Sequence, residues 1–214
     1  DGVAFNFADP RAFHVQDPNS LSGKVLRLDP LTGQGLADNP FHEAGDSLDL
    51  NRSKVFQVGL RNPFSLGFTN EGALVIADTG QSSFEEINIG APGANFGWPF
   101  FEGADFDRLF TPPNFRDTPT SGFADEWAEF RASGIEVTRP WRGFAHKDLD
   151  PGFQFQAIVG GDVDYDGGVY PDSLNGHYFF SDFSDGEVFV VDLKDRSDVR
   201  FLYQHEGEGP LSFT

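Results

Sequence analysis

The feature of this sequence that most limits its fold is a series of short β-strand signals separated by tight turns. Aliphatic and aromatic residues gather in short runs at positions 25–28, 55–58, 65–68, 73–76, 86–89, 157–159, 163–165, 177–180, 187–191 and 199–203. Residues 69–72 (TNEG) carry a hairpin signal between two of these runs. The 25 Phe, 25 Gly and 14 Pro residues suit short aromatic strands better than long helices. The sequence therefore predicts an all-β fold.

The strand signals fall into groups of about four, which is how the blades of a β-propeller are built. Residues 63–98 and 157–205 each fit one blade, and residues 1–58 fit parts of an earlier one. A β-sandwich has similar strand spacing, so periodicity alone leaves both architectures open. Residues of about 100–151 break the rhythm and are interpreted as a long loop excursion with a short helix at 124–132, although a structureless insertion is equally compatible with them.

Charge and composition exclude several classes of function. The formal net charge of −19 repels nucleic acid and anionic membranes and favours cations such as calcium. The chain has no cysteine, so it offers no disulfide, no thiol nucleophile and no thiolate metal site. No apolar run approaches 18 residues, and we predict no membrane span. Neither a G-x-S-x-G elbow nor a Walker loop is present, which argues against serine hydrolases and nucleotide hydrolysis.

Three stretches in order resemble the glucose/sorbosone dehydrogenase family. The first is 21–30 (LSGKVLRLDP). The second comprises 59–64 (GLRNPF), 77–81 (ADTGQ), 85–88 (EEIN) and 93–99 (GANFGWP). The third comprises 160–161 (GG), 168–171 (GVYP) and 174–183 (LNGHYFFSDF). The resemblance implies a six-bladed β-propeller that uses pyrroloquinoline quinone (PQQ) and calcium, and a secreted, periplasmic or extracellular location.

The resemblance also implies site residues. Arg61 and Asn62 face the cofactor in the family, and the backbone carbonyls of Gly80 and Gln81 occupy the positions that hold calcium. A guanidinium fork and an amide suit the carboxylates of PQQ, and carbonyl oxygens suit calcium. A second interpretation of the residues remains open, in which Arg61 meets an acidic neighbour in a turn and Asn62 caps the backbone.

The family's catalytic histidine lies upstream of the position that matches the start of this chain, so we expect the base outside it. At about 40–45 residues per blade, 214 residues cannot complete six blades. An open propeller would expose strand edges. We therefore expect residues 1–214 to form a partial propeller domain, completed by a further segment or subunit.

Several positions depart from the family pattern. Thr79 and Gln81 stand where many cofactor-using members have histidine and proline, and this loop looks more like hedgehog-interacting-protein propellers. Residues 184–186 (SDG) lack the family's cofactor-facing lysine, and 206–209 (EGEG) lack its arginine pair. Losing cations that face a trianionic cofactor costs roughly 1.5–3 kcal/mol for each charge-assisted hydrogen bond. These departures argue against PQQ binding.

Other candidate sites remain open. Glu85 and Glu86 can bind a structural ion, pin the neighbouring loop or form a strand-end salt bridge. Residues 162–167 (DVDYDG) imitate the start of a calcium loop but lack its final glutamate, and they also fit a strand. The five histidines show no metal-ligand spacing and are interpreted as surface or strand residues. Three tryptophans can stack on sugars or pack in the core: Trp98, Trp127 and Trp141.

Two functions follow from these observations. The first is a PQQ- and calcium-dependent oxidoreductase acting on aldose sugars or related alcohols, with Arg61 and Asn62 as cofactor ligands and Gly80 and Gln81 as calcium ligands. The second is a non-catalytic secreted β-propeller that binds a protein or glycan partner. The family match supports the first, and the missing cations support the second.

Overall fold

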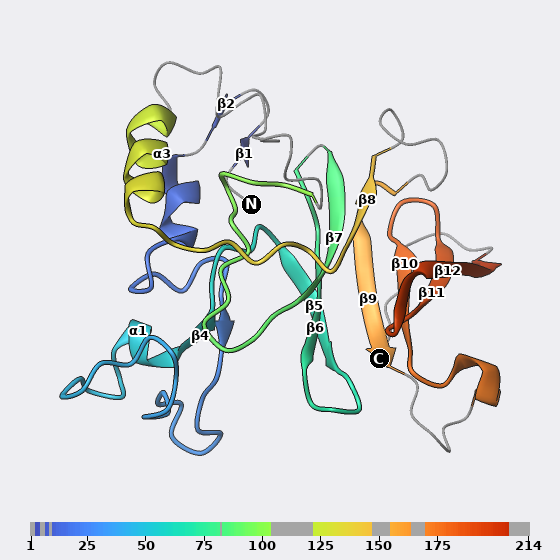
Figure 1. Cartoon of the computed structure of the whole chain (residues 1–214), viewed down its shortest axis with the longest axis horizontal. Helices are drawn as coiled ribbons and strands as arrows, with labels where there is room; N and C mark the ends of the chain where they lie inside the picture. The colour runs from blue at the N-terminus through green and yellow to red at the C-terminus, as the bar shows by residue number, and fades with distance from the viewer. Residues whose placement is uncertain are drawn as a thin grey trace. The chain divides into compact units, whose positions relative to one another are not determined.

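The computed structural model describes residues 10–81, 83–103, 122–146, 155–163 and 170–205, together with the backbone of two short strands near the N-terminus. The chain divides into two compact units (Figure 1). The first unit comprises Asp1–Asn62 and Gly90–Arg139, and the second comprises Pro63–Ile89 and Pro140–Thr214.

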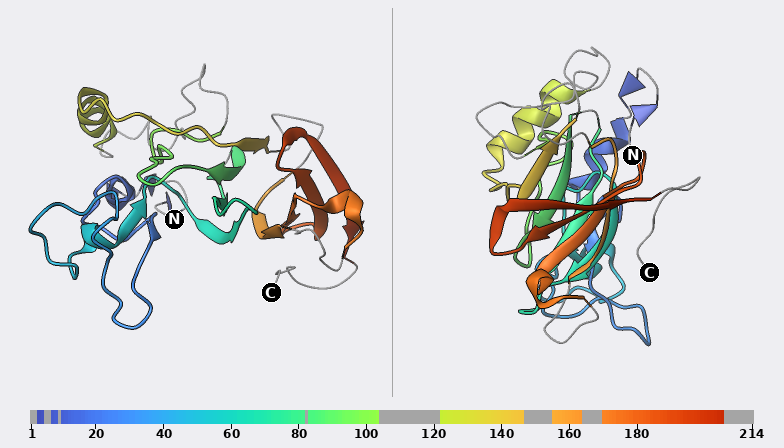
Figure 2. Two further views of the ribbon diagram at one scale, coloured as in Figure 1. Left: turned by 60° about the horizontal axis from the view of Figure 1, so that its bottom comes forward. Right: turned by 90° about the vertical axis from the view of Figure 1, so that its right-hand side faces the viewer.

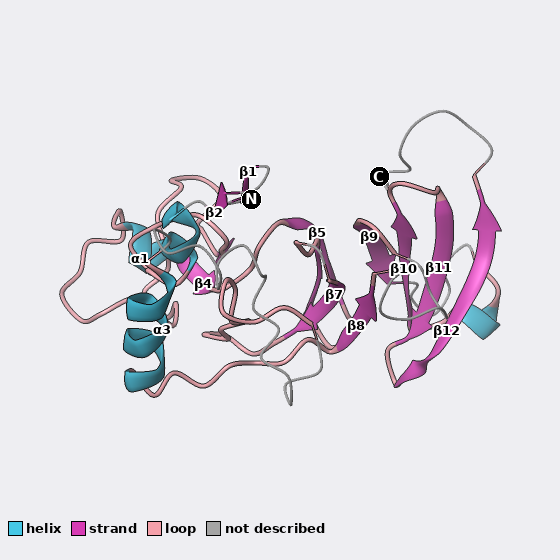
Figure 3. Cartoon of the chain, turned by 90° about the horizontal axis from the view of Figure 1, so that it is seen from above, coloured by secondary structure: helices cyan, strands magenta, loops and turns pink. Residues whose placement is uncertain are grey.

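The second unit contains two four-stranded antiparallel sheets (Figures 1 and 3). The strands of the first sheet, in spatial order, are β5 (Pro63–Phe68), β6 (Leu74–Asp78), β7 (Phe84–Ile89) and β8 (Arg142–Ala145). The strands of the second sheet, in spatial order, are β9 (Ile158–Val163), β10 (His177–Asp182), β11 (Glu187–Asp192) and β12 (Asp195–Gln204). The short helix η2 (Asp172–Leu174) precedes β10. Each sheet runs up and down between neighbours, as a propeller blade does.

Burial differs along each sheet. All residues of β6 and of β10 are buried, whereas β12 is largely exposed. Strands covered on both faces read as continuous hydrophobic runs, and an edge strand does not need them. The sequence Leu74-Val75-Ile76-Ala77 therefore forms a central strand, and the largely exposed β12 forms the outer edge that Figure 2 shows in red.

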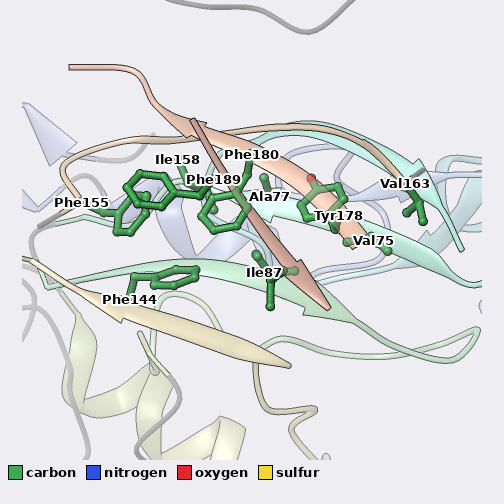
Figure 4. Close-up of a cluster of buried hydrophobic side chains, with 11 residues drawn as sticks. Val75, Ala77, Ile87, Phe144, Phe155, Ile158, Val163, Tyr178, Phe180 and Phe189 are labelled. Carbon is green, nitrogen blue, oxygen red and sulfur yellow. The ribbon is translucent and has the colours of Figure 1, made fainter. Parts of the chain in front are cut away.

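The core of the second unit lies between its two sheets. Figure 4 shows aromatic rings from both sheets gathered with smaller aliphatic side chains. The ring of Phe144 on β8 lies 5.2 Å from that of Phe180 on β10, measured between centroids. Phe155, just before β9, lies 4.6 Å from Phe144 and 4.9 Å from Phe189 of β11. Aromatic contacts of this kind add to the hydrophobic burial and hold the sheets together.

Glycine permits the closest approach between the sheets, where β9 packs along β5. The N–H of Gly160 on β9 donates to Ser65 Oγ on β5 at 2.8 Å. A Cβ at Gly160 would lie 2.8 Å from the Cβ of Ala77 and would overlap the hydroxyl of Tyr178. The Gly160-Gly161 pair therefore lets β9 continue as one strand from Ile158 to Val163, where the sequence predicts two separate runs.

The first unit combines short strands with helical turns. Its strands are β1 (Val3–Ala4), β2 (Phe7–Ala8), β3 (Val25–Leu26) and β4 (Val55–Gln57). Its helices are η1 (Pro10–Val15), α1 (Asn51–Lys54) and α3 (Phe123–Ala132). Phe123, Trp127 and Phe130 share one face of α3 because they are spaced by four and three residues, and they pack on Phe13 and Phe100.

The structure confirms the all-β, propeller-type fold and most of the predicted strands. The helix predicted at 124–132 is α3. The blade predicted at 63–98 is wrong in its last part, because residues 90–98 belong to the first unit and β8 supplies the fourth strand. The excursion at about 100–151 stays a prediction, since 104–121 and 147–154 lie outside the described residues. None of the described helices is long and apolar enough to cross a membrane.

Candidate functional site

The turn that follows β6 carries the two predicted calcium ligands, Gly80 and Gln81. Thr79 Oγ1 donates to the carbonyl oxygen of Ile158 at 3.1 Å, at the start of β9. The N–H of Gly80 donates to Glu85 Oε2 at 3.3 Å. The turn is half-buried and is held from two sides, by β7 of its own sheet and by β9 of the neighbouring sheet. Such anchoring fixes the backbone of a turn that would present carbonyl oxygens to an ion.

Glu85 on β7 is the anchor of this turn, and its side chain is fully buried. In addition to Gly80, Glu85 Oε2 accepts the N–H of Ile158 at 2.9 Å. Glu85 Oε1 lies 2.7 Å from Nε2 of His146. Burial raises the pKa of Glu85, while the hydrogen bonds from His146 and from the two backbone N–H groups oppose the rise. The structure thus supports the interpretation that Glu85 pins the loop.

The neighbouring acid, Glu86, has a local role. Its Oε2 accepts a hydrogen bond from Nδ2 of Asn88 at 3.0 Å, and both residues are buried. Alternation along β7 directs Glu85 and Glu86 to opposite faces of the sheet. Glu85 is the acid of this pair that accepts the N–H of Gly80 in the turn after β6.

Arg61 and Asn62, the predicted cofactor ligands, end the first of the two segments that form the first unit. The guanidinium carbon of Arg61 lies 5.7 Å from the ring centroid of Trp98, which is 4% exposed. This cation–π contact positions the planar guanidinium group of Arg61 against the indole ring. The N–H donors of a guanidinium point outward in its own plane. Both Arg61 and Asn62 are half-buried, which suits side chains that meet a ligand.

The backbone around Arg61 is built from two of the motif stretches. The N–H of Trp98 donates to the carbonyl of Gly59 at 2.9 Å, and Val58 pairs with Asn95 in a parallel bridge. Gly59 has φ +79°, and a Cβ there would lie 2.7 Å from the N atom of Gly97. Residues 58–59 and 95–98 are therefore joined within the first unit. Arg61 and Asn62 belong to the first unit, whereas Gly80 and Gln81 belong to the second.

The hairpin between β10 and β11 stands where the family has its lysine. Asp182 Oδ1 accepts the N–H of Ser184 at 2.6 Å and that of Asp185 at 3.3 Å. Partial burial, with the nearby Asp185 and Asp182 carboxylates, raises the pKa of Glu187. Three acidic side chains thus gather at this hairpin. Their negative charge favours binding of a cation and disfavours binding of a ligand that carries carboxylates. The predicted mismatch at 206–209 lies outside the described residues, as does the calcium-like run after Val163.

Sequence reasoning did not identify His146 as the partner of Glu85. The two residues are 61 positions apart, so no local spacing connects them. The backbone N–H of His146 donates to the carbonyl of Ser83 at 2.8 Å, and this hydrogen bond fixes the position of His146 beside β7. To predict the contact between Glu85 and His146, one would have to know that residues 142–145 pair with β7 as a neighbouring strand.

At the other end of these sheets lies a hollow of about 420 Å³. Trp141, Ile89 and Leu193 supply apolar surface in it, and polar side chains surround them. The polar lining residues are Thr69, Asn70, Glu71, Asn175 and Lys194. Because the hairpin at Thr69 and the turn at Gly80 cap opposite ends of β6, the hollow is separate from the Glu85 cluster.

Comparisons with known proteins agree with this architecture. The family model described as Glucose / Sorbosone dehydrogenase matches residues 6–161. HIPL1 protein of Arabidopsis thaliana is 30% identical over 171 residues, which are 72% of this chain and 22% of that protein. Quinoprotein glucose dehydrogenase B of Acinetobacter calcoaceticus is 33% identical over 132 residues, which are 60% of this chain and 26% of that protein.

The PQQ-bound form of aldose sugar dehydrogenase from Streptomyces coelicolor has a similar fold. It matches with a TM-score of 0.60 at 20% identity, over 96% of this chain and 46% of that one. The chain thus spans about a fifth to a quarter of these curated relatives, at 22% and 26%, and about half of the solved structure.

Proposed function

Because this chain belongs to the glucose/sorbosone dehydrogenase family, we propose that it forms part of a PQQ- and calcium-dependent oxidoreductase acting on aldose sugars or related alcohols. The observation that carries the proposal is the turn at Gly80 and Gln81, held rigidly by the buried carboxylate of Glu85. We propose that the backbone carbonyls of this turn hold calcium.

The residues present fit a calcium ion. Calcium prefers hard oxygen donors, and the turn supplies carbonyl oxygens whatever its side chains are. Thr79 Oγ1 and the Gly80 N–H are both engaged with buried acceptors, so the turn need not reorganise around an ion. The acidic hairpin at Asp185, at the same end of the second unit, adds negative potential that attracts cations.

The fit to PQQ is divided. Arg61, oriented by Trp98, offers a fork that suits one carboxylate, and Asn62 offers an amide donor beside it. The hairpin 184–186 does not fit a second carboxylate, because acidic side chains replace the family's lysine. We therefore assign the cofactor's contacts in this chain to Arg61 and Asn62 alone.

When bound, PQQ would supply a hydride acceptor for the sugar, and calcium would polarise its quinone oxygen. Arg61 and Asn62 would orient that acceptor, and Gly80 and Gln81 would hold the ion. Glu85 acts as a positioning residue because it touches the turn and not the reacting atoms. We assign the proton-accepting base to no residue of this chain and expect it to be the family's upstream histidine.

We further propose that a further segment or subunit completes the propeller and that the protein works in a secreted, periplasmic or extracellular setting. The chain covers 46% of the solved dehydrogenase chain, which supports a missing portion. The acidic composition, with a net charge of −19, suits a calcium-rich medium.

A calorimetric titration of PQQ into the calcium-loaded chain tests the proposal. We expect micromolar or tighter binding, weakened about 10- to 100-fold in Arg61→Ala by loss of a charge-assisted hydrogen bond. Arg131→Ala is the matched control, because Arg131 also lies 5.7 Å from a tryptophan ring, that of Trp127, on the exposed face of α3. Absence of PQQ binding by the folded, calcium-loaded chain would overturn the cofactor assignment.

The second candidate function is a non-catalytic propeller that binds a glycan or protein partner. The hollow at Trp141 favours it, because an indole surface surrounded by amide, hydroxyl and charged groups suits sugar rings. Oligosaccharide titrations followed by tryptophan fluorescence test this function. A response that Trp141→Ala abolishes and Trp127→Phe retains would support it, and equal responses in both variants would exclude the hollow as the site.

A further inference from the structure

We propose that His177, Asp192 and Asp198 form a binding site for a transition-metal dication of the zinc class. A ring nitrogen of His177 and one carboxylate oxygen from each aspartate lie within 4.8 Å of one another. The site is distinct from the Gly80 turn. It lies at the end of the second sheet opposite the acidic hairpin at Asp185, because β10 starts and β11 ends there.

The three residues come together through the register of three neighbouring strands. His177, the first residue of β10, pairs with Asp192, the last residue of β11. Asp198 lies on β12, one residue before Val199, which pairs with Val191. Hydrogen-bonded strands lie about 4.8 Å apart, so side chains that share a face at this end converge without a loop.

The decisive observation is the state of the His177 ring. The residue is 4% exposed, and its Nδ1 lies 3.3 Å from the carbonyl oxygen of Asn175. Its Nε2 is buried and has no hydrogen-bond partner among the described residues. A carbonyl can only accept, so Nδ1 is the donor of this hydrogen bond, and in the neutral ring Nε2 offers its lone pair to an ion. Metal-bound histidines use this arrangement, with the second nitrogen donating to a carbonyl.

The donor set selects the kind of ion. One imidazole and two carboxylates suit zinc and similar dications, whereas calcium and magnesium prefer oxygen ligands throughout. Zinc bonds of about 2.0–2.2 Å place tetrahedral donors about 3.3–3.6 Å apart. Side-chain rotations would bring the three donors, now within 4.8 Å of one another, to this spacing, and water would complete the tetrahedron.

A nearby cation competes for one ligand. Arg200 Nη2 lies 2.5 Å from Asp198 Oδ2, and its Nε lies 2.9 Å from Asp198 Oδ1. Arg200 is exposed and can turn toward water, so the ion can share Asp198 or displace the guanidinium. Asp192 Oδ1 accepts the N–H of Lys194 at 2.8 Å, which among the described residues leaves Oδ2 for the ion.

The expected consequence is a stronger outer edge of the blade. β12 is largely exposed, whereas β10 is buried throughout. An ion shared by His177 and Asp198 would tie this edge strand to the buried β10 through β11. Metal links between segments stabilise the folded state in proportion to their affinity.

Calorimetry and thermal unfolding of the whole chain with zinc chloride test the site, in excess calcium so that calcium-type sites are filled. We expect one equivalent of zinc to bind with micromolar or tighter affinity. At 100 times the dissociation constant, Tm should rise by about 5–10 °C. Magnesium at the same concentration should give no shift.

Variants distinguish this site from incidental zinc binding. His177→Phe keeps an aromatic ring in the buried position and should weaken zinc binding about 100-fold or more. Asp192→Asn offers a second test if His177→Phe does not fold, and His205→Phe is the control in the same unit. Arg200→Gln should tighten binding by removing the competing cation. Binding that persists in both His177→Phe and Asp192→Asn, or no zinc response in the folded chain, overturns the proposal.

Discussion

Nε2 of His146 lies 2.7 Å from Oε1 of Glu85, a carboxylate that solvent does not reach. The other oxygen of Glu85 accepts the N–H groups of Ile158 and Gly80. One buried side chain thereby joins the end of one blade, the start of the next and the turn proposed to hold calcium. Buried carboxylates are stable only with such donors, so the cluster acts as a unit.

Removing the carboxylate should destabilise the second unit. Glu85→Ala leaves two backbone N–H groups without an acceptor, and we expect the free energy of unfolding to fall by about 2–4 kcal/mol. Urea unfolding at neutral pH measures the change. The control is Glu71→Ala in the exposed hairpin, expected to stay within about 0.5 kcal/mol of the wild type. Equal losses in the two variants would contradict the role of Glu85.

The same residue predicts a pH dependence. Burial raises the pKa of Glu85 above the ordinary 4.5, so the folded state keeps its proton to a higher pH than the unfolded chain. The contribution of Glu85 to stability is therefore complete below pH 4.5 and is lost as the pH rises through the raised pKa.

Glu85→Gln cannot titrate at this position and provides the reference. The free energy of unfolding of the wild type minus that of Glu85→Gln should fall as the pH rises above 4.5 and then level off. Urea unfolding across this range, where both proteins are folded, measures the difference. A difference that increases with pH would show that the folded state favours the ionised carboxylate.

Gly160 should tolerate no side chain. Gly160→Ala places a methyl group against Ala77 and the Tyr178 hydroxyl, and we expect a loss of about 1–3 kcal/mol from overpacking. Gly72→Ala is the comparison variant, because Gly72 has φ +80° and open space around it. Its loss of stability measures backbone strain in the absence of a steric clash. The double variant with Tyr178→Phe should recover part of the loss, because it removes the overlapping hydroxyl. A double-mutant cycle in urea without coupling would contradict the packing.

Thr79 should tune calcium affinity through the shape of its turn. Thr79→Val removes the hydrogen bond to the Ile158 carbonyl while it keeps the side-chain volume. We expect calcium binding to weaken about 2- to 10-fold, which corresponds to one hydrogen bond. Calcium calorimetry measures this effect, with Thr69→Val at the opposite end of the sheet as the control. Unchanged calcium affinity in Thr79→Val would contradict the proposal that this turn holds calcium.

Features that depend on neighbours along the chain can be predicted from the sequence. The alternation of strand runs and turns predicts the hairpin at 69–72 and nine of the ten strand runs with little shift, and the spacing of Phe123, Trp127 and Phe130 suits α3. Ordered motifs indicated the family and nominated Arg61, Asn62, Gly80 and Gln81. Local preferences and motif spacing act over a few residues, which is why a sequence reveals them.

Contacts between residues that are distant in the sequence become visible in the folded structure. Glu85 and His146 are 61 positions apart, and β8 joins a sheet whose other strands end at Ile89. His177, Asp192 and Asp198 show no metal-ligand spacing and converge only through the register of three strands. Such contacts arise when sheets pair and pack, because burial and strand register, and not local propensity, bring side chains together.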